Sequence, residues 1–303
     1  MTMRTLTPHS RARLPDSPPH TNFSGGCEME FTETQQNRLK ELGCPLENRE
    51  FDSATERDKA FAALEKKYAA VMKLHIRQLS ETVRRPKLTV LREKLAETLV
   101  EAGFLQVETP TVISREFLRR MSVDDGHPLN EQVYWLHGGR CLRPMLAPNL
   151  YYVSKDLLNI CGKPLGIFEV GSCFRKESKG SAHLEEFTML NIVEWGVPIE
   201  LRNERLRELA AIVLTAADIS EYEFETEQSA VYGETTDVTV DGLEVGSASM
   251  GPHKLDSNWG IMESWVGVGF GVERLLFVKE KPATIHAVGR SITYLDGAKL
   301  NVK

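Results

Sequence analysis

Two stretches of the sequence carry charged residues at spacings suited to holding a nucleotide. Arg175 and Glu177 lie two residues apart in a segment with a strand pattern, so both side chains are expected to leave the same face. Residues 269–276 (GFGVERLL) place a glycine-rich turn directly before an apolar helix, with Arg274 in its first turn. A guanidinium group donates two hydrogen bonds to phosphate oxygens, and glycine lets a backbone approach a ligand closely. Together these residues predict a site for a bent, multiply charged nucleotide.

The elements that must position these residues are strands joined by short connections. Strand patterns span 133–136, 167–175, 187–195, 236–240 and 243–248, and an amphipathic helix spans 201–217. Consecutive strands favour an antiparallel sheet over alternating strand–helix units. The glycines also fit no dinucleotide-binding motif, because the third glycine of G-x-G-x-x-G would fall at Val272 or Arg274. We therefore expect an α+β fold in which helices flank an antiparallel sheet.

The sequence patterns divide the chain into three parts. Residues 1–28 are rich in Pro, Ser, Thr, Arg and Gly without periodicity, which predicts a disordered tail. Residues 29–86 carry two helical patterns, at about 32–42 and 53–79, and predict a small helical appendage. The main domain is expected at 87–303.

The main domain is expected to begin with a helix and a strand. Leu88, Leu91, Leu95 and Leu99 form one apolar stripe, and Gly103 is expected to end this helix. The following segment, 104–110, has a strand pattern that ends in a proline.

The composition of the 303 residues is that of a globular protein, with 41% hydrophobic and 26% charged residues and a net charge of -6. The five cysteines are irregularly spaced without a Cys-x-x-Cys pair, so neither a disulfide framework nor a zinc site is indicated. No apolar run approaches a membrane span, and the N-terminus lacks the apolar core of a signal peptide. We expect a cytoplasmic protein without a membrane partner.

Segments 87–110, 174–177, 186–191 and 269–276, in this chain order, resemble the three motifs of class II aminoacyl-tRNA synthetases. Residues 174–177 (FRKE) with 186–191 (EFTMLN) resemble motif 2, and 269–276 resembles motif 3. The helix, short strand and proline at 87–110 resemble motif 1, which forms the dimer interface in that family. The resemblance implies a class II synthetase-like sheet, ATP with Mg²⁺ as cofactors, tRNA as a partner, and a homodimer.

Such an enzyme activates a carboxylate by its attack on the α-phosphate of ATP, which expels pyrophosphate. This chemistry needs positioning and positive charge more than covalent help. Arg175 is the candidate for the α-phosphate, while Phe187 offers adenine an apolar face, with Arg274 as the cation on its other face. Glu244, near a strand end, is the candidate Mg²⁺ carboxylate. His183 is interpreted as a phosphate contact from a loop, because no H-E-x-x-H zinc motif exists.

Each of these residues also has a plainer interpretation. Arg175 and Glu177 could form a surface ion pair, Phe187 could be a core residue, and Glu244 could face solvent on an edge strand. The glycines suit any tight strand–helix turn.

Longer motifs narrow the resemblance to one family. Residues 142–151, 171–178, 183–191, 231–235 and 265–271 closely resemble the catalytic part of the pyrrolysyl-tRNA synthetases. The resemblance runs from about Met29 to the C-terminus. It implies an ATP site formed by Arg175, Glu177, His183, Leu184, Phe187, Glu244, Ser247, Gly269 and Arg274. It implies an amino-acid pocket formed by Ala147, Leu150, Tyr151, Asn191, Val193, Tyr232 and Trp265.

The substrate of that family is lysine with a bulky acyl ring on its side-chain nitrogen. A deep apolar cavity suits the ring, Asn191 can donate to the amide carbonyl, and Tyr232 can close over the ring from a loop. Plain lysine would be rejected by an unfilled cavity and a desolvated ammonium group. The resemblance thus implies pyrrolysine–tRNA ligase activity.

The sequence departs from the family pattern in two respects. Ser154 and Ser249 stand where larger apolar residues are expected, and Val193 where a small polar residue is common, so the pocket floor is expected to differ in shape. No separate tRNA-binding domain is expected upstream of Met29, so either another chain supplies that module or the enzyme works without it.

Basic residues predict where tRNA would bind. Arg77, Arg84, Arg85 and Lys87 cluster in an acidic chain, and the last three are candidates for phosphate contacts. Residues 176–183 would meet the acceptor end. The alternatives are a synthetase paralogue that acts as an amino-acid ligase without tRNA, for which the helical appendage would be superfluous, and a non-catalytic tRNA-binding module.

Overall fold

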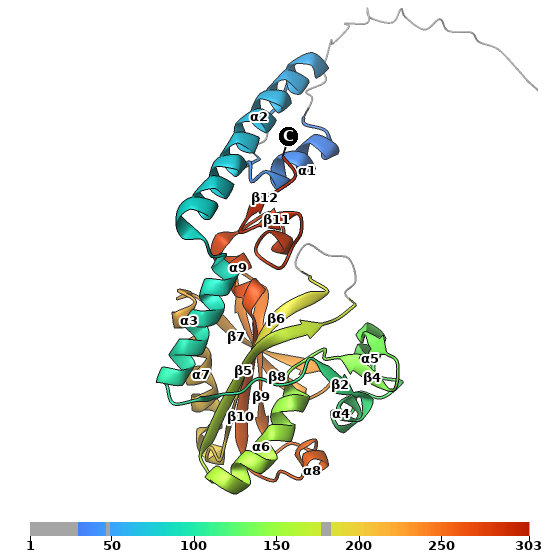
Figure 1. The fold of residues 1–303 in the computed structure, drawn as a ribbon, viewed down its shortest axis with the longest axis vertical. Coiled ribbons are helices and arrows are strands. Elements are labelled where there is room, and N and C mark those ends of the chain that lie inside the picture. The colour runs from blue at the N-terminus through green and yellow to red at the C-terminus, as the bar shows by residue number, and fades with distance from the viewer. Residues whose placement is uncertain (1–29, 47–48, 177–182, 303) are drawn as a thin grey trace, which may run out of the picture.

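The computed structural model describes residues 30–46, 49–176 and 183–302, and the expected tail at 1–28 lies outside these ranges. Its centre is one seven-stranded sheet with helices on both sides (Figure 1). In spatial order the strands are β1 (Leu105–Gln106), β5 (Leu165–Phe174), β6 (Glu186–Trp195), β10 (Trp265–Gly271), β9 (Leu243–Gly251), β8 (Gly233–Val240) and β7 (Glu223–Ser229). Only the β1–β5 pair is parallel within this sheet of described residues. The α+β prediction is therefore confirmed.

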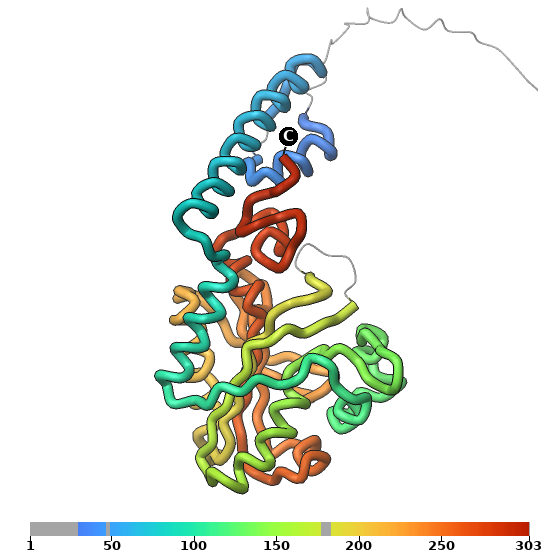
Figure 2. The backbone as a smooth tube through the Cα atoms, in the orientation of Figure 1, coloured from blue at the N-terminus to red at the C-terminus, as the bar shows by residue number. Residues whose placement is uncertain are grey.

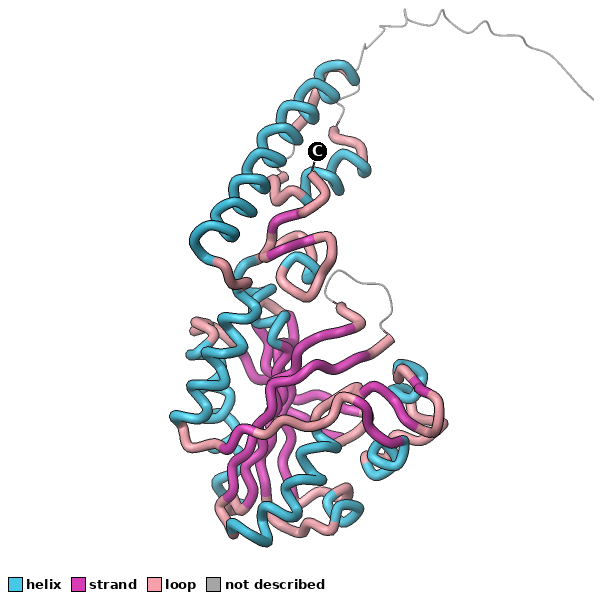
Figure 3. The backbone as a smooth tube through the Cα atoms, in the orientation of Figure 1, coloured by secondary structure: helices cyan, strands magenta, loops and turns pink. Residues whose placement is uncertain are grey.

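One face of the sheet forms the main hydrophobic core. Along β10, Val266, Val268 and Phe270 alternate with glycines and are fully buried. They pack in a cluster with α3 (Lys87–Glu101), α7 (Arg202–Ala216) and α9 (Val272–Glu280). Figure 3 shows these helices flanking the strands. Side chains alternate along each strand, so the residues between these core positions point to the opposite face of the sheet. That face is available for a site.

The elements around the opposite face include a long helix that the sequence patterns did not predict. This helix, α6, has a buried side formed by Leu150, Tyr151 and Ser154. It belongs to a second hydrophobic cluster. The elements of this region are α6 (Ala147–Cys161), α8 (Asp256–Trp259), α4 (Arg115–Arg120), α5 (Pro128–Gln132) and the small sheet β2 (Val112–Ser114), β4 (Arg140–Leu142) and β3 (Trp135–Leu136).

The helices predicted from periodicity lie close to their expected bounds. The two N-terminal ones are α1 (Glu33–Glu41), capped by a reciprocal Thr32–Gln35 box, and α2 (Ala54–Gln78), capped by Ser53. Helix α2 continues into the π-turn η1 (Leu79–Val83). The short 3₁₀ segments are η2 (Ile199–Leu201) and η3 (Ile285–Ala287). Gly103, at φ +90°, follows the end of α3 as predicted. In contrast, only β1 forms within the strand expected at 104–110.

The C-terminal segment packs against the N-terminal helices. Its hairpin, β11 (Tyr294–Leu295) and β12 (Ala298–Lys299), lies beside α2, and the chain end lies near α1 (Figure 2). In the hairpin turn, Asp296 accepts a 2.7 Å hydrogen bond from Lys87 N at the start of α3 and lies 3.8 Å from His75 of α2. Lys299 pairs with Glu41 of α1. These contacts join the C-terminal hairpin to α1, to α2 and to the start of α3.

Candidate active site

A cavity of about 610 Å³ opens on the face of the sheet that carries the glycines. Its floor comes from three neighbouring strands. On β6 the residues are Met189, Asn191, Val193 and Trp195; on β10, Trp265, Gly267, Gly269 and Gly271; on β9, Ser247 and Ser249. All described residues expected to form the ATP site and the amino-acid pocket line this cavity, whereas Ser154, expected at the pocket floor, does not. Glu177 lies outside the described residues. The structure thus brings together residues that span 128 positions of the sequence, from Ala147 to Arg274.

The glycine-rich segment is a strand, which corrects the turn predicted from its sequence. Gly267, Gly269 and Gly271 belong to the central strand β10, hydrogen-bonded to β6 and β9, and none of them has a positive φ. A Cβ at Gly269 would lie 3.1 Å from Asn191 Oδ1, and one at Gly267 would lie 3.1 Å from Trp265 Cζ3. The glycines are therefore needed for space rather than for a turn. Because they have no side chains, they leave bare backbone as the floor of the cavity. The helix predicted after them, α9, does place Arg274 in its first turn.

Arginines and carboxylates face one end of the cavity, called here the nucleotide end. Arg175 Nε donates to Pro144 O at 2.9 Å, and its guanidinium carbon lies 5.3 Å from the centre of the Phe187 ring. Arg274 Nη1 lies 3.2 Å from the Glu244 carboxylate. Arg175 therefore lies over the ring that was expected to stack with adenine.

A buried glutamate fixes the helix that carries Arg274. Glu273 accepts hydrogen bonds from Thr188 N at 2.8 Å and Thr188 Oγ1 at 2.9 Å, and Arg290 Nη1 lies 3.3 Å away. Burial raises the pKa of Glu273 above its usual value, although the Thr188 hydrogen bonds and Arg290 oppose this shift. These contacts tie the first turn of α9 to β6 and so hold Arg274 in register with Phe187.

Aromatic rings surround the other end of the cavity, called here the amino-acid end. Tyr151 packs edge-on against Trp195 and Trp265, with ring centres 5.5 and 6.0 Å apart. Tyr232 closes the same end, 6.1 Å from Trp265. Burial raises the pKa of both tyrosines well above the usual range, so both hydroxyls keep their protons. This end is therefore an apolar pocket with an amide, Asn191, on its floor.

The serine expected at the pocket floor, Ser154, instead supports a wall from behind. It is fully buried and is not among the residues that line the cavity. Its Oγ accepts a 2.9 Å hydrogen bond from Trp195 Nε1. Trp195, which the sequence did not single out, occupies the floor in its place. Ser249 does line the cavity, as expected.

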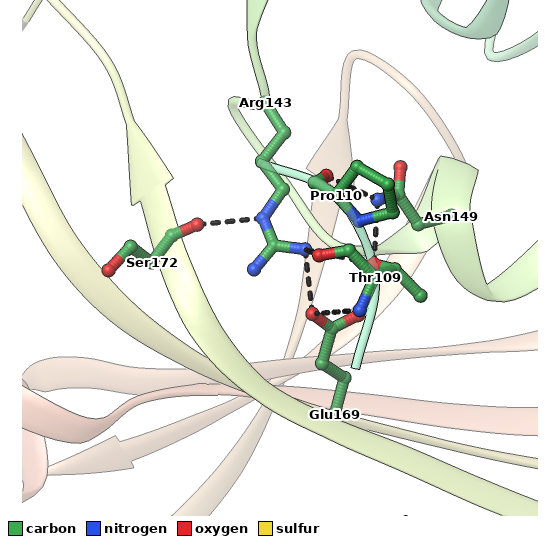
Figure 4. Close-up of polar contacts among 6 residues, drawn as sticks. All are labelled: Thr109, Pro110, Arg143, Asn149, Glu169 and Ser172. Carbon is green, nitrogen blue, oxygen red and sulfur yellow. Dashed lines mark hydrogen bonds and ion pairs between the residues drawn. The ribbon is translucent and has the colours of Figure 1, made fainter. Parts of the chain in front are cut away.

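A buried polar cluster holds the framework behind the site (Figure 4). Arg143 Nη1 lies 2.6 Å from Glu169 Oε1 of β5, and Arg143 Nε donates to Ser172 O at 2.8 Å. Glu169 also accepts from Thr109 Oγ1 at 2.6 Å, and Asn149 of α6 donates to Thr109 Oγ1 at 2.7 Å. The cluster ties the segment after β1 to β5 and to the first turn of α6, which carries Ala147 and Leu150.

Comparison with known proteins identifies the family. The family described as phenylalanyl tRNA synthetase beta chain CLM domain matches residues 77–266. A crystal structure of pyrrolysyl-tRNA synthetase from Desulfitobacterium hafniense is 47% identical and superposes with a TM-score of 0.85, covering 90% of this chain and 99% of that one. The chain belongs to the pyrrolysyl-tRNA synthetases. A second structure of a pyrrolysyl tRNA synthetase from that organism is 48% identical, with a TM-score of 0.84 and coverages of 91% and 99%.

Pyrrolysyl-tRNA synthetases are class II aminoacyl-tRNA synthetases, so this chain is an ATP-dependent ligase whose substrates are an amino acid and a tRNA. The cavity suits these reactants, since it joins an end lined by arginines and carboxylates to an apolar one. In the described part of the chain, no helix has the length and apolar content needed to cross a membrane.

The synthetase also carries oxygen ligands suited to Mg²⁺. Glu244 and Ser247 line the nucleotide end together with Asp237, whose Oδ1 accepts a 2.6 Å hydrogen bond from Ser247 Oγ. Among the described residues, no group of three or more His, Cys, Asp or Glu side chains could by itself hold a metal ion. Such a sparse set fits Mg²⁺, which takes one or two carboxylates and completes its shell with substrate phosphates and water. Asp237 was missed because only the pairing of β8 with β9 brings it to Ser247.

Proposed function

We propose that this synthetase is a pyrrolysine–tRNA ligase. It activates pyrrolysine, a lysine with a bulky acyl ring on its side-chain nitrogen, with ATP to an aminoacyl-adenylate and transfers it to the 3′ end of its tRNA. The observation that carries this proposal is the two-ended cavity. One strand, β6, presents Phe187 to the nucleotide end and Asn191 and Val193 to the amino-acid end. The reacting carboxylate and the α-phosphate would meet between these ends.

At the nucleotide end, Arg175 grips the α-phosphate and Arg274 stacks with adenine and neutralises phosphate charge. Guanidinium groups fixed before the reaction stabilise the charge that develops on the phosphorus centre without reorganisation. Glu244 would hold Mg²⁺ on the phosphates, with the Ser247 hydroxyl as a neighbouring oxygen ligand. Asp237 would accept the hydrogen bond that this hydroxyl donates. Mg²⁺ would supply charge neutralisation on the expelled pyrophosphate. His183, Leu184 and Gly269 complete the ATP site.

At the amino-acid end, aromatic and aliphatic side chains cover the acyl ring, and Asn191 donates to the amide carbonyl. Asn191 lies beside Gly269 on the cavity floor, where glycine leaves its amide accessible. A buried amide of the ligand needs a polar partner, and plain lysine would leave the cavity unfilled. Tyr232, from the turn between β7 and β8, closes over the ring.

The tRNA would approach along the N-terminal helical module, residues 29–86. Of the predicted phosphate contacts, Arg85 pairs with Glu93 and Lys87 with Glu280, and both cations stay about half exposed. Exposed ion pairs of this kind exchange readily for a phosphate, since they contribute at most about 1 kcal/mol. Helix α2 adds Lys59, Lys66 and Lys73, which recur every seven residues on its exposed side. This row extends the basic surface beyond Arg84, Arg85 and Lys87.

The chain is further proposed to act in the cytoplasm as a homodimer. Either a separate chain supplies a tRNA-binding module or the enzyme works without one. Val100, Leu105 and Val112, in and after the motif 1 helix, expose 52%, 46% and 41% of their surface. Exposed apolar side chains in these elements suit a dimer contact. Gel filtration at twice the chain mass supports the dimer, and a monomer at micromolar concentration contradicts it.

Amino-acid-dependent exchange of pyrophosphate into ATP tests the reaction itself. The substrates are pyrrolysine, an N6-carbamoyl lysine and the twenty common amino acids, each with and without tRNA. Exchange with the bulky lysine derivatives alone, followed by charging of the tRNA, supports the proposal. Exchange with a common amino acid contradicts the pocket assignment. Activation without any tRNA charging points to the tRNA-independent ligase.

A further inference from the structure

A buried carboxylate lies directly behind the amino-acid end of the cavity. Asp256, the first residue of α8, is 2% exposed and is not among the residues that line the cavity. Its Oδ1 accepts a hydrogen bond from Tyr151 Oη at 2.8 Å. Its Oδ2 accepts from Trp265 Nε1 at 2.9 Å and from His253 N at 2.6 Å. Because Tyr151 and Trp265 both line the cavity, one side chain holds two of its walls.

The Asp256 carboxylate stands in largely aromatic surroundings. Asp256 lies beside the cluster formed by Tyr151, Trp259 and Trp265, and its three donors are all neutral. Within the described ranges of the chain, Asp256 forms no ion pair. An apolar side chain in its place would leave the three donors without an acceptor, so the carboxylate satisfies groups that the aromatic cluster cannot. What the carboxylate adds is direction, since it fixes where the polar atoms of two aromatic rings point.

The rings are held in place from several sides. The Tyr151 ring stacks on Trp259 at 5.5 Å and 14°, which fixes its plane, while Asp256 fixes the direction of its hydroxyl. The Trp265 indole lies over Gly251, where an added Cβ would come 1.9 Å from Trp265 Nε1. With their polar atoms turned toward Asp256, both residues offer apolar ring surface to the cavity. The carboxylate therefore helps to hold two rings that form walls of the amino-acid end.

The same contacts reach the Tyr232 turn through His253. His253 Nδ1 accepts a 3.2 Å hydrogen bond from Leu255 N, so the ring proton is assigned to Nε2. Nε2 then donates to Tyr232 O at 3.0 Å. His253 N in turn donates to Asp256. Three residues that the cavity presents to the substrate thus connect to Asp256: two directly and Tyr232 through one histidine.

We propose that Asp256 is a positioning residue that sets the width of the amino-acid end and thereby selects which N6-substituted lysines enter. The proposal rests on the proposed function for the substrate class. It concerns the amino-acid end alone, because Arg175 and Arg274 are held by Pro144 and Glu244 instead. Changes at Asp256 are therefore expected to raise the KM for the amino acid and to leave the KM for ATP in place.

Two substitutions at Asp256 distinguish a role in positioning the aromatic rings from a role in folding. In Asp256→Asn the amide oxygen can accept from Trp265 and His253 while the amide nitrogen donates to the Tyr151 hydroxyl oxygen, so all three contacts survive. Asp256→Leu keeps the branching and the number of heavy atoms of the side chain, with bulkier methyl groups in place of the oxygens, and removes all three contacts. Asp156→Asn, at an exposed position of the same helix as Tyr151, is the matched control. For each full-length variant, pyrophosphate exchange gives both KM values, and near-ultraviolet circular dichroism reports the packing of the aromatic rings.

Asp256→Leu is expected to raise the KM for an N6-acyl lysine about tenfold or more, with the KM for ATP within about twofold, because misplaced pocket walls lose positioned binding. Asp256→Asn and Asp156→Asn are expected to stay close to the unaltered protein. An unchanged amino-acid KM in Asp256→Leu, or an equal rise in both KM values, overturns the proposal.

Two further comparisons cover the cases in which Asp256→Leu does not fold or the unaltered protein is inactive. If Asp256→Leu does not fold, Tyr151→Phe removes one contact and is expected to raise the amino-acid KM about threefold; no change overturns the proposal. If the unaltered protein shows no exchange with any lysine derivative, the proposed function fails. In that case, an unchanged near-ultraviolet spectrum in Asp256→Leu also refutes the positioning role, and an altered spectrum restored by Asp256→Asn supports it.

Discussion

Arg274 reaches from the first turn of α9 back to Glu244 on β9. Its Nη1 lies 3.0 Å from the carbonyl oxygen and 3.2 Å from the carboxylate of Glu244. The two side chains are 26% and 46% exposed, so their ion pair contributes at most about 1 kcal/mol to stability. Both line the nucleotide end, where a guanidinium held at a set position has far more to contribute to catalysis than to folding.

Arg274→Ala is therefore expected to lower the rate of adenylate formation by about 10²- to 10³-fold, the usual effect of removing one preorganised charge from a reacting centre. Its melting temperature is expected to change little. Pyrophosphate exchange and thermal unfolding measure the two effects. Lys281→Ala, which breaks the exposed Lys281–Asp241 pair, is the control and is expected to leave both unchanged. Comparable losses in the two variants would argue against a role for Arg274 at the phosphates.

Gly269→Ala tests the bare floor of the cavity. The added Cβ would lie 3.1 Å from Asn191 Oδ1 and 3.3 Å from Met189 Cε, and the strand φ of Gly269 is open to alanine. The protein should fold, while activation of the amino acid falls about tenfold because the Asn191 amide is displaced. Gly126→Ala is the matched control, since its new Cβ would meet Asp124 at an ordinary 3.7 Å. Equal activities of the two variants would show that the floor tolerates a side chain.

The Arg143–Glu169 pair is expected to matter for stability. Both side chains are 3% exposed, so the removal of one partner strands a buried charge. Glu169→Gln is expected to lower the free energy of unfolding by about 3 to 5 kcal/mol, measured by urea denaturation. The exposed pair between Lys94 and Asp218 is the comparison, and Asp218→Asn should cost about 1 kcal/mol or less. A similar small cost at Glu169 would mean that water reaches the pair.

The free energy of unfolding is expected to depend on pH through the buried Glu273 carboxyl. Its folded pKa is raised above the ordinary value of 4.5, so the folded state binds the proton more tightly than the unfolded state. The stability that this group contributes is present below the unfolded pKa and is lost as pH rises through the raised folded pKa. Glu273→Gln removes this titration and should flatten the stability profile above pH 4.5. Urea unfolding of both proteins at a series of pH values measures the difference, and parallel profiles would contradict the prediction.

Local pattern was sufficient for much of the fold. Helices α1, α2, α3 and α7 follow from periodicity, because each closes its hydrogen bonds within one segment. Strands β5 and β6 follow from long apolar alternation. The described residues expected to form the ATP site and the amino-acid pocket do line one cavity, and their individual roles stay predictions.

Other elements depended on neighbours far away in the sequence. The Gly-x-Gly-x-Gly run of β10 has the composition of a turn, and only the ladders to β6 and β9 make it a central strand. Helix α6 was missed although its inward side carries three pocket residues, Ala147, Leu150 and Tyr151. Ser154 was assigned to the pocket floor, whereas the packing of Trp195 against it decides otherwise.

The sequence by itself determined the family, the α+β class and the charged and apolar residue types of the site, because motif residues and periodicity are local properties of the chain. The tertiary structure decided which of them meet. Asp256 lies 105 positions from Tyr151, and Asp237 is 10 positions from Ser247 on a separate strand. Burial and hydrogen-bond partners are set when the sheet and helices pack together. A carboxylate that is unremarkable in the sequence therefore becomes, in the folded protein, the group that orients two walls of the pocket.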